Sequence, residues 1–271
     1  NYGALAINFL VPGNLLLLGY SLKTRKGFFE LIIWLSLTFS IYITIGFRYR
    51  LFILLLGMSA MVFIAKKIKF KPIFAFIGLA ILGFGFSFLG SIRRYGYGIK
   101  ISEDDFNFLK IVRNIFSESR ISLVTGKLIS LVPEQIDYVG IKPIINIIKA
   151  PIPAGILDYK DNIDYIRKAL VGIYDNDILS LGASYLIYGE FYLMGGWLVL
   201  IIIALLMGYL YRFLWIWFNQ RKEELLAHVV FITNLTFMYV IIHRASSVQA
   251  IMLFSFTVLP VIIYYYKSKT K

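Results

Sequence analysis

Seven ionisable residues that flank long apolar stretches are the positions of this sequence best suited to chemistry. They are Arg48, Arg50, Arg93, Arg94, Glu190, His243 and Arg244. Guanidinium groups stay charged and present a planar fork of donors that matches phosphate oxygens. The arginines therefore predict binding of a phosphate or pyrophosphate group. His243 and Glu190 are the candidate general bases, because imidazole and carboxylate side chains accept protons in catalysis.

The same residues also have structural interpretations, which the sequence leaves open. Arginines at the edge of an apolar span often extend towards the headgroup region and bind phospholipids. Glu190 can pair with one of these arginines, and His243 can serve as a polar helix end. A phosphate site is favoured for the arginines as a set, and the base is not assigned between His243 and Glu190.

Motifs for metals, nucleotides and covalent catalysis are missing from the sequence. It has no cysteine, which excludes thiolate catalysis, cysteine-ligated zinc and iron–sulfur clusters. Its two histidines argue against a histidine-rich metal centre. The patterns G-x-x-x-x-G-K-[ST], G-x-S-x-G and H-E-x-x-H do not occur. We therefore expect chemistry without a metal ion and without a cofactor.

The composition places these residues in a membrane protein. Of the 271 residues, 59% are hydrophobic and 16% are charged, against about 45–50% and about 25% in soluble domains. Seven apolar stretches approach the length of a bilayer-spanning helix, roughly 17–25 residues. They are 4–20, 28–46, 51–65, 72–90, 191–214, 225–242 and 248–266, and Pro12-Gly13 is expected to break the first. The prediction is an all-α polytopic membrane protein with about seven transmembrane helices.

The net charge of +13 gathers on one predicted side of the membrane. Basic clusters follow the first, third and fifth spans and close the chain, at 23–26, 66–71, 212–222 and 267–271. Because these joints alternate, all four clusters face one side, which the positive-inside rule identifies as cytoplasmic. Most of the charge is thus a topology signal, and nucleic acid is not an expected partner. The candidate arginines, His243 and Glu190 all fall on the opposite, extracytoplasmic face.

Residues 91–190 form one long external segment between the fourth and fifth predicted spans. Loops longer than about 15 residues are uncommon in compact proteins and are often functional. Helices are expected from Ser102 to Phe116, at 121–132 and at 161–174, with an extended turn at 149–153. The domain prediction is therefore 1–90 for spans one to four, 91–190 for a helical lid, and 191–271 for spans five to seven. A small external cap that only packs is the alternative.

Several short segments together resemble bacterial O-antigen polymerases and ligases. Residues 46–51 (GFRYRL) resemble the external arginine turn of those families, and Arg244-Ala245-Ser246 resembles a late external arginine motif. Residues 143–153 with 180–184 resemble their long external loop. Residues 188–196 (YGEFYLMGG) resemble the Glu-aromatic-Tyr-x-x-Gly segment that begins the next span. The chain departs from the family in having fewer spans and in carrying Phe47 and Tyr49 beside Arg48. With its start at Asn1, this predicts the C-terminal portion of a longer protein.

The resemblance implies a Wzy-type polymerase of the GT-C class in the bacterial cytoplasmic (inner) membrane, multi-pass and with an extracytoplasmic active face. Such glycosyltransferases join undecaprenyl-pyrophosphate-linked oligosaccharide repeat units into O-antigen or capsule-type polysaccharide, without a metal. A single displacement is expected to invert the anomeric centre. The resemblance also implies that Arg48, Arg244 and one of Arg93 and Arg94 bind the donor pyrophosphate. The expected partners are the lipid-linked donor and acceptor, membrane lipids and a chain-length regulator protein.

Other functions compete with polymerisation. An O-antigen ligase uses lipid A core as the acceptor in place of a second repeat unit, and sequence alone barely separates the two. A flippase or transporter for lipid-linked oligosaccharide is expected to show mid-span charges and internal repeats, whereas the polar groups here cluster at one rim. A structural membrane subunit is a third alternative.

Overall fold

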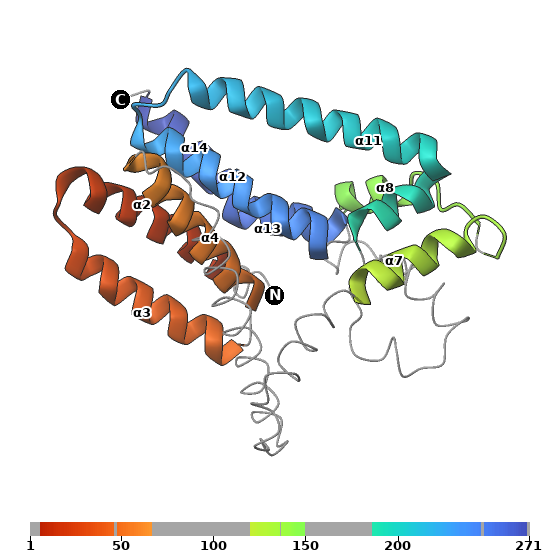
Figure 1. Cartoon of the computed structure of the whole chain (residues 1–271), viewed down its shortest axis with the longest axis horizontal. Helices are drawn as coiled ribbons and strands as arrows, with labels where there is room; N and C mark the ends of the chain where they lie inside the picture. Colours follow the sequence, from red (N-terminus) through yellow and green to blue (C-terminus); the bar gives the residue numbers. More distant parts are fainter. Residues whose placement is uncertain are drawn as a thin grey trace, which may run out of the picture. The chain divides into compact units, whose positions relative to one another are not determined.

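The computed structural model describes residues 6–45, 48–66, 120–135, 137–149, 186–244 and 247–269. Every regular element within these ranges is helical (Figure 1). The elements are η1 (Ile7–Phe9), α2 (Leu10–Thr24), α3 (Phe28–Ile45), α4 (Arg48–Ala65), α7 (Arg120–Leu131), α8 (Lys142–Lys149), α11 (Ile187–Asn219), α12 (Leu225–Arg244), α13 (Ser247–Thr257) and α14 (Leu259–Lys269). The all-α prediction is therefore confirmed for the described part of the chain.

The predicted apolar stretches correspond to described helices, except for 72–90, which lies outside the described residues. Two helical stretches are long and apolar enough to cross a membrane: Ile187–Asn219, which is α11, and Ala250–Lys269, which joins most of α13 to α14. Shorter apolar helices occur at Phe28–Thr44, Arg50–Ala65 and Leu225–Met238. Length and composition of these helices thus support association with a membrane.

The chain divides into two compact units. Unit 1 comprises Asn1–Ser119, Lys222–Thr236 and Pro260–Lys271, and unit 2 comprises Arg120–Arg221 and Phe237–Leu259. In unit 1, the described helices are η1, α2, α3, α4, the first part of α12 and nearly all of α14. In unit 2, they are α7, α8, α11, the end of α12 and α13. Each unit is described by itself.

Close helix packing in unit 1 depends on two glycines. A Cβ atom at Gly57 of α4 would lie 3.2 Å from both methyl groups of Leu15 in α2 and 3.6 Å from the Thr236 methyl in α12. A Cβ atom at Gly19 of α2 would contact the side chains of Leu225 and Met61. Small residues let helix backbones approach closely, which is the usual device where water does not drive helices together. The glycines therefore bring α2, α4 and the first part of α12 into contact.

Polar contacts also join α2 to α3, which run side by side in Figure 1. The Asn14 Nδ2 group donates to the Thr38 hydroxyl at 2.8 Å and to the Leu10 carbonyl at 2.7 Å. The Tyr42 hydroxyl donates to the Ile7 carbonyl at 3.0 Å. Hydrogen bonds between buried polar groups remove most of their desolvation cost. These bonds fix the register of α3 against η1 and α2.

The expected break at Pro12-Gly13 is wrong. Both residues lie inside α2, which begins two residues earlier at Leu10. Proline is tolerated in the first turn of a helix because N–H groups there have no intrahelical acceptor. The irregular part is η1, which precedes the proline.

A cluster of hydrogen bonds around Glu224 lies at one end of unit 1. The Glu224 carboxylate, just before α12, accepts hydrogen bonds of 2.7 Å from the Tyr265 hydroxyl and 2.7 Å from the Lys269 ammonium group. Both donors belong to α14, so the start of α12 lies beside the end of α14. The Lys269–Glu224 pair is substantially exposed to solvent, where an ion pair contributes little to stability.

The ends of α2 and α4 also lie at this end of unit 1. The contacts of Gly19 with Leu225 and Met61 place the last turns of both helices beside the first turn of α12. Each of these helix ends borders one of the four basic clusters of the sequence. Among the described residues of unit 1, the cluster members at this end include Lys23, Lys66, Lys222 and Lys269.

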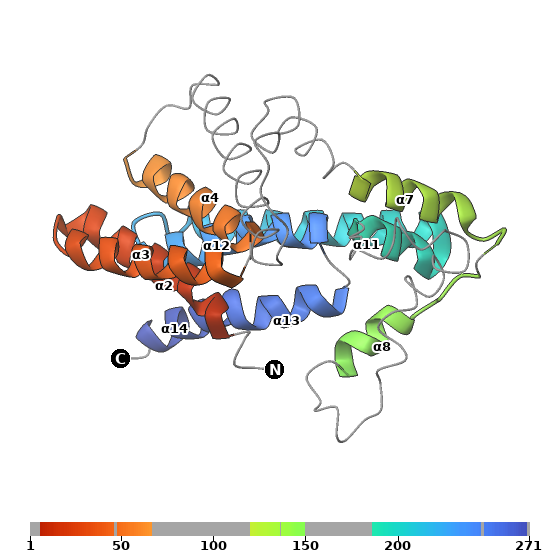
Figure 2. The ribbon, with the colours of Figure 1, turned by 90° about the horizontal axis from the view of Figure 1, so that it is seen from below.

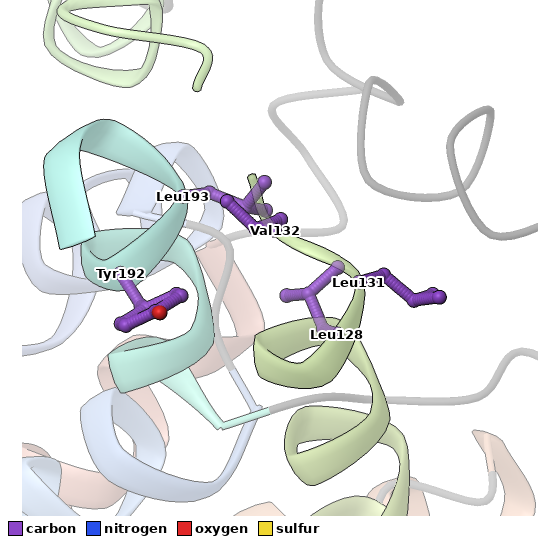
Figure 3. Close-up of a cluster of buried hydrophobic side chains, with 5 residues drawn as sticks. All are labelled: Leu128, Leu131, Val132, Tyr192 and Leu193. Carbon is purple, nitrogen blue, oxygen red and sulfur yellow. The ribbon is translucent and has the colours of Figure 1, made fainter. Parts of the chain in front are cut away.

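In unit 2, α7 packs against the first two turns of α11. Figure 3 shows Leu128 of α7 on the side of Tyr192 and Val132 beside Leu193 of α11, and Leu131 belongs to the same buried cluster. The Thr125 hydroxyl of α7 accepts a 2.8 Å hydrogen bond from the backbone N–H of Leu186, just before α11. A Cβ atom at Gly189 would lie 3.0 Å from Leu128, so this glycine permits the close approach. The prediction of a helix at 121–132 is confirmed by α7.

Helix α11 contains a break at a glycine pair. Gly195 and Gly196 have non-helical dihedral angles, and Gly196 has φ 67° and ψ −155°, a conformation that glycine alone adopts readily. The break separates the packed first turns from a long apolar part. Large apolar side chains on that part stay exposed, among them Trp197, Leu198, Ile201, Leu205 and Tyr209. A helix that is apolar on an uncovered face is suited to contact with lipid.

The close contact at Gly57 gives a first prediction. Substituting Gly57→Leu forces a side chain into Leu15 and Thr236, and we expect a loss of about 1–3 kcal/mol of stability through overpacking. Gly13→Leu in α2 is the matched control, because Gly13 is exposed and a Cβ atom there meets nothing within 4 Å. The measurement is the thermal unfolding midpoint of each variant in detergent. Equal midpoints for the two variants would contradict the packing described for unit 1.

The break in α11 gives a second prediction. Gly196→Ala places a Cβ atom 2.9 Å from the Tyr138 hydroxyl and forces a strained dihedral angle, at a cost of about 1–3 kcal/mol. Gly208→Ala, farther along the same helix and with open space around it, is expected to leave stability unchanged or raise it. Urea unfolding of both detergent-solubilised variants measures the difference. A Gly196→Ala variant as stable as Gly208→Ala would show that the break is not required.

Candidate functional site

The carboxylate of Glu190 joins the first turn of α11 to the first residue of α13. Its Oε2 atom accepts a 2.6 Å hydrogen bond from the backbone N–H of Ser247, and its Oε1 atom accepts a 3.0 Å bond from the Ser247 hydroxyl. The exposed fractions are 1% for Glu190 and 6% for Ser247. Both oxygens therefore bind donors of one residue, and α13 sets the orientation of the carboxylate.

The helical spacing of the two partners explains the contact. Ile187, Glu190 and Phe191 recur at positions that share one face of α11. Ile187 and Phe191 pack with Ala250, which lies one turn after Ser247 in α13. The apolar contacts therefore align the two helix faces and leave Glu190 opposite Ser247.

The electrostatics of a helix terminus favour this arrangement. The first N–H groups of a helix have no intrahelical acceptor, and the helix dipole places partial positive charge there. The Ser247 N–H is one of these groups, and Glu190 supplies the acceptor from a neighbouring helix. Burying a carboxylate is costly unless it is hydrogen-bonded, and bonds to an ionised group contribute about 1.5–3 kcal/mol. Glu190 and the α13 terminus thus satisfy each other.

His243 and Arg244 are the last two residues of α12, and the structure describes their backbone but not their side chains. Ser247 follows Arg244 after Ala245 and Ser246, which lie outside the described residues. The Glu190–Ser247 contact therefore fixes the chain three residues beyond Arg244. In unit 2 the structure thus brings predicted site residue Glu190 to the chain segment that carries His243 and Arg244.

The predicted arginines of the 45–50 turn belong to unit 1. Arg50 is buried, with 4% exposed, and Arg48 begins α4, with only its backbone described. An arginine this deeply buried differs from one that extends along the surface towards lipid headgroups. Arg48 and Arg50 lie at the start of α4, and Lys66 with its basic cluster follows the other end. The length of α4, about 27 Å, separates the two ends. Arg93 and Arg94 fall outside the described residues, so the grouping of all the candidates stays a prediction.

Ser247 and Thr125 are residues that the sequence reasoning missed. The Thr125 hydroxyl binds the backbone N–H of Leu186 just before α11, and Ser247 binds Glu190 in the first turn of α11. Neither residue belongs to a recognisable motif. A signal for Ser247 was present, because a serine at a helix start often carries hydrogen bonds to terminal groups. Sequence alone did not reveal that the partner comes from a helix 57 residues earlier. Among the described residues, no group of three His, Asp or Glu side chains is placed to hold a metal ion.

Comparison with known proteins gives no assignment. No protein-family model, no curated protein and no solved structure matches this chain. The resemblance to O-antigen polymerases therefore rests on short segments of sequence alone.

The buried carboxylate gives a third prediction. Glu190→Ala leaves the Ser247 N–H and hydroxyl without this acceptor in a buried place, and we expect a loss of about 2–4 kcal/mol. Ser247→Ala removes one of the two bonds and is expected to cost about 1 kcal/mol. The double variant should be less destabilised than the sum, with a coupling energy of about 0.5–3 kcal/mol. Unfolding in detergent measures each term.

Glu134→Ala serves as the control for this cycle, because Glu134 is exposed after the end of α7. Its stability is expected to stay within about 0.5 kcal/mol of the parent protein. Strictly additive losses at Glu190 and Ser247 would refute the contact.

Proposed function

We propose that this protein polymerises lipid-pyrophosphate-linked oligosaccharide repeat units at the outer face of the bacterial cytoplasmic membrane. The observation that carries the proposal is the Glu190–Ser247 contact. Two separate segments, 188–196 and 244–246, resemble the polymerase family. Glu190 belongs to the first segment, and Ser247 directly follows the second, so the contact brings the first segment to the end of the second. The proposal takes these two segments as parts of one site, and their proximity in unit 2 supports it.

The proposed reaction is a single displacement. A hydroxyl oxygen of the acceptor sugar forms a bond to the anomeric carbon of the donor glycan, while the bond from that carbon to the pyrophosphate oxygen breaks. The hydroxyl proton passes to a base, and the undecaprenyl pyrophosphate leaves with the bonding electron pair. Arginines neutralise the growing charge on the leaving group, which stabilises the transition state electrostatically. Inversion at the anomeric carbon follows from the single step.

The residues take distinct roles in this proposal. Arg244, Arg48 and one of Arg93 and Arg94 bind the pyrophosphate, and His243 is the favoured base. Both oxygens of Glu190 are hydrogen-bonded and almost fully buried. A general base must come within hydrogen-bond reach of the substrate proton. Glu190 is therefore better suited to position the segment that carries His243 and Arg244 than to accept the proton itself.

The membrane setting is the second part of the proposal. The basic ends of α2, α4, α12 and α14 gather at one end of unit 1, while Arg48 and Arg50 begin α4 at its other end. A length of about 27 Å for α4 is close to the roughly 30 Å hydrocarbon core of a bilayer. We propose about seven spans in a GT-C-like arrangement, with the basic end in the cytoplasm.

A ligase for the same lipid-linked glycan is the second candidate, because the resembling segments are shared between polymerases and ligases. It uses the same leaving group and differs in the acceptor. The outcome that separates them is the product: polymerase loss leaves single repeat units, whereas ligase loss leaves long polymer that is not attached to lipid A core.

Arginine substitution is the test of the proposed function. Arg48→Ala and Arg244→Ala, each expressed as the sole copy in its native host, are expected to lower polymerisation about 10²–10³-fold, as does removal of a group that stabilises transition-state charge. The readout is the length distribution of polysaccharide together with the accumulation of single lipid-linked units. Arg212→Ala is the control, because Arg212 is exposed and belongs to a predicted cytoplasmic cluster.

Membrane levels of each variant are checked by immunoblot, so that loss of protein is not mistaken for loss of activity. Unchanged chain length in both variants would overturn the site assignment. Extension of lipid-linked repeats by the purified protein in EDTA would separate an enzyme from a flippase.

A further inference from the structure

Helix α8 leaves one isoleucine face exposed and buries a face that contains the polar Asn146. Ile144, Ile145 and Ile148, with Ile141 just before the helix, recur at helical spacing and share one face. They are all exposed, from 37% for Ile145 to 69% for Ile148. Pro143 and Asn146 lie on the opposite face and are buried. The pattern is the reverse of an amphipathic helix that packs on a protein core in water.

The neighbours of α8 account for the buried face. In unit 2 this helix contacts α13 and, less extensively, α11. Figure 1 shows α8 near the first turns of α11, and Figure 2 shows it set apart from α11 and closer to α13. The face with Asn146 is therefore held against the protein, and the isoleucine face points away from it. The sequence did not predict this helix, and Lys149, expected in an extended turn, is its last residue.

Charge and length restrict what covers the isoleucine face. Lys142 and Lys149 stand at the two ends of α8, where their ammonium groups can meet the anionic phosphates of lipid headgroups. Eight residues of helix reach about 12 Å, far short of the roughly 30 Å needed to cross the hydrocarbon core. A short helix with an apolar face and flanking lysines fits the boundary between headgroups and acyl chains.

Aromatic residues beside the break in α11 also indicate a boundary between headgroups and acyl chains. Tyr138, four residues before α8, has its hydroxyl against Gly196 and is partly exposed. Trp197 follows the glycine pair and is also exposed. Tyrosine and tryptophan collect where a membrane protein passes from the acyl chains to the headgroups. The level at which the apolar part of α11 begins therefore carries the residues of an interface.

We propose that α8 is an interfacial membrane anchor, whose isoleucine face enters the outer leaflet while Lys142 and Lys149 contact phospholipid phosphates. The inference rests on the membrane setting proposed above and does not depend on the reaction. Anchored in this way, α8 and the helix α13 that it contacts meet the outer boundary of the bilayer.

The chain has no cysteine, which makes single-site labelling the direct test. Ile144→Cys and Ile148→Cys are each labelled with a nitroxide, and the full chain is reconstituted in vesicles of phosphatidylethanolamine and phosphatidylglycerol. Collisions with oxygen report exposure to acyl chains, and collisions with a water-soluble nickel chelate report exposure to water. Leu205→Cys, in the exposed apolar part of α11, is the lipid reference, and Glu134→Cys is the water reference.

The anchor predicts an oxygen-to-nickel collision ratio at positions 144 and 148 several-fold above that at 134 and below that at 205. A ratio at 144 and 148 equal to that at 134, with a high ratio at 205, overturns the anchor and leaves the membrane setting intact. Low access of both reagents at 144 and 148 indicates a protein partner and also overturns it. A low ratio at 205 removes the membrane setting and, with it, the anchor.

Discussion

A carboxylate that is cut off from water must find hydrogen-bond donors inside the protein, and in unit 2 Ser247 supplies two of them to Glu190. This requirement explains why α11 and α13 meet at their first turns rather than at their middles. The apolar contacts of Ile187 and Ala250 continue the same interface. On the other side, the Thr125 hydroxyl binds the chain that leads into α11 and ties α7 to the same turn. Three helices are thus placed relative to one carboxylate.

In unit 1, close contact at two glycines brings α2, α4 and the first part of α12 together. Glycines at Gly19 and Gly57 allow side chains of neighbouring helices to reach the backbone, and dispersion forces then act over many short contacts. Charged groups are found at the helix ends, as in the Glu224–Lys269 pair. The unit thereby keeps its apolar middle separate from a basic end, which is the distribution of charge that a bilayer sorts.

Hydrophobic patterning predicted the long helices because it depends on composition over many residues. The ranges 28–46 and 225–242 agree with α3 and α12 within two residues at each end. The stretch 248–266 is interrupted at Val258, two residues before Pro260, whose missing N–H removes a helical bond. Helix α8 was missed because it is short and starts beside a proline. Which of its faces is buried depends on tertiary contacts. For the candidate site, sequence identified Glu190, but its partner depends on tertiary contacts that local spacing does not contain.

The glycine pair in α11 separates the long apolar part of the helix from the turn that carries Glu190. Over its full 33 residues an unbroken α11 would extend about 50 Å, well beyond the hydrocarbon core, whereas residues 197–219 reach about 35 Å. A span slightly longer than the bilayer is wide adapts by tilting. In the proposed membrane setting, a joint at Gly195-Gly196 lets the apolar part of α11 change its tilt in thicker or thinner bilayers. The turn that carries Glu190 then keeps its place against α13, whatever the thickness of the bilayer.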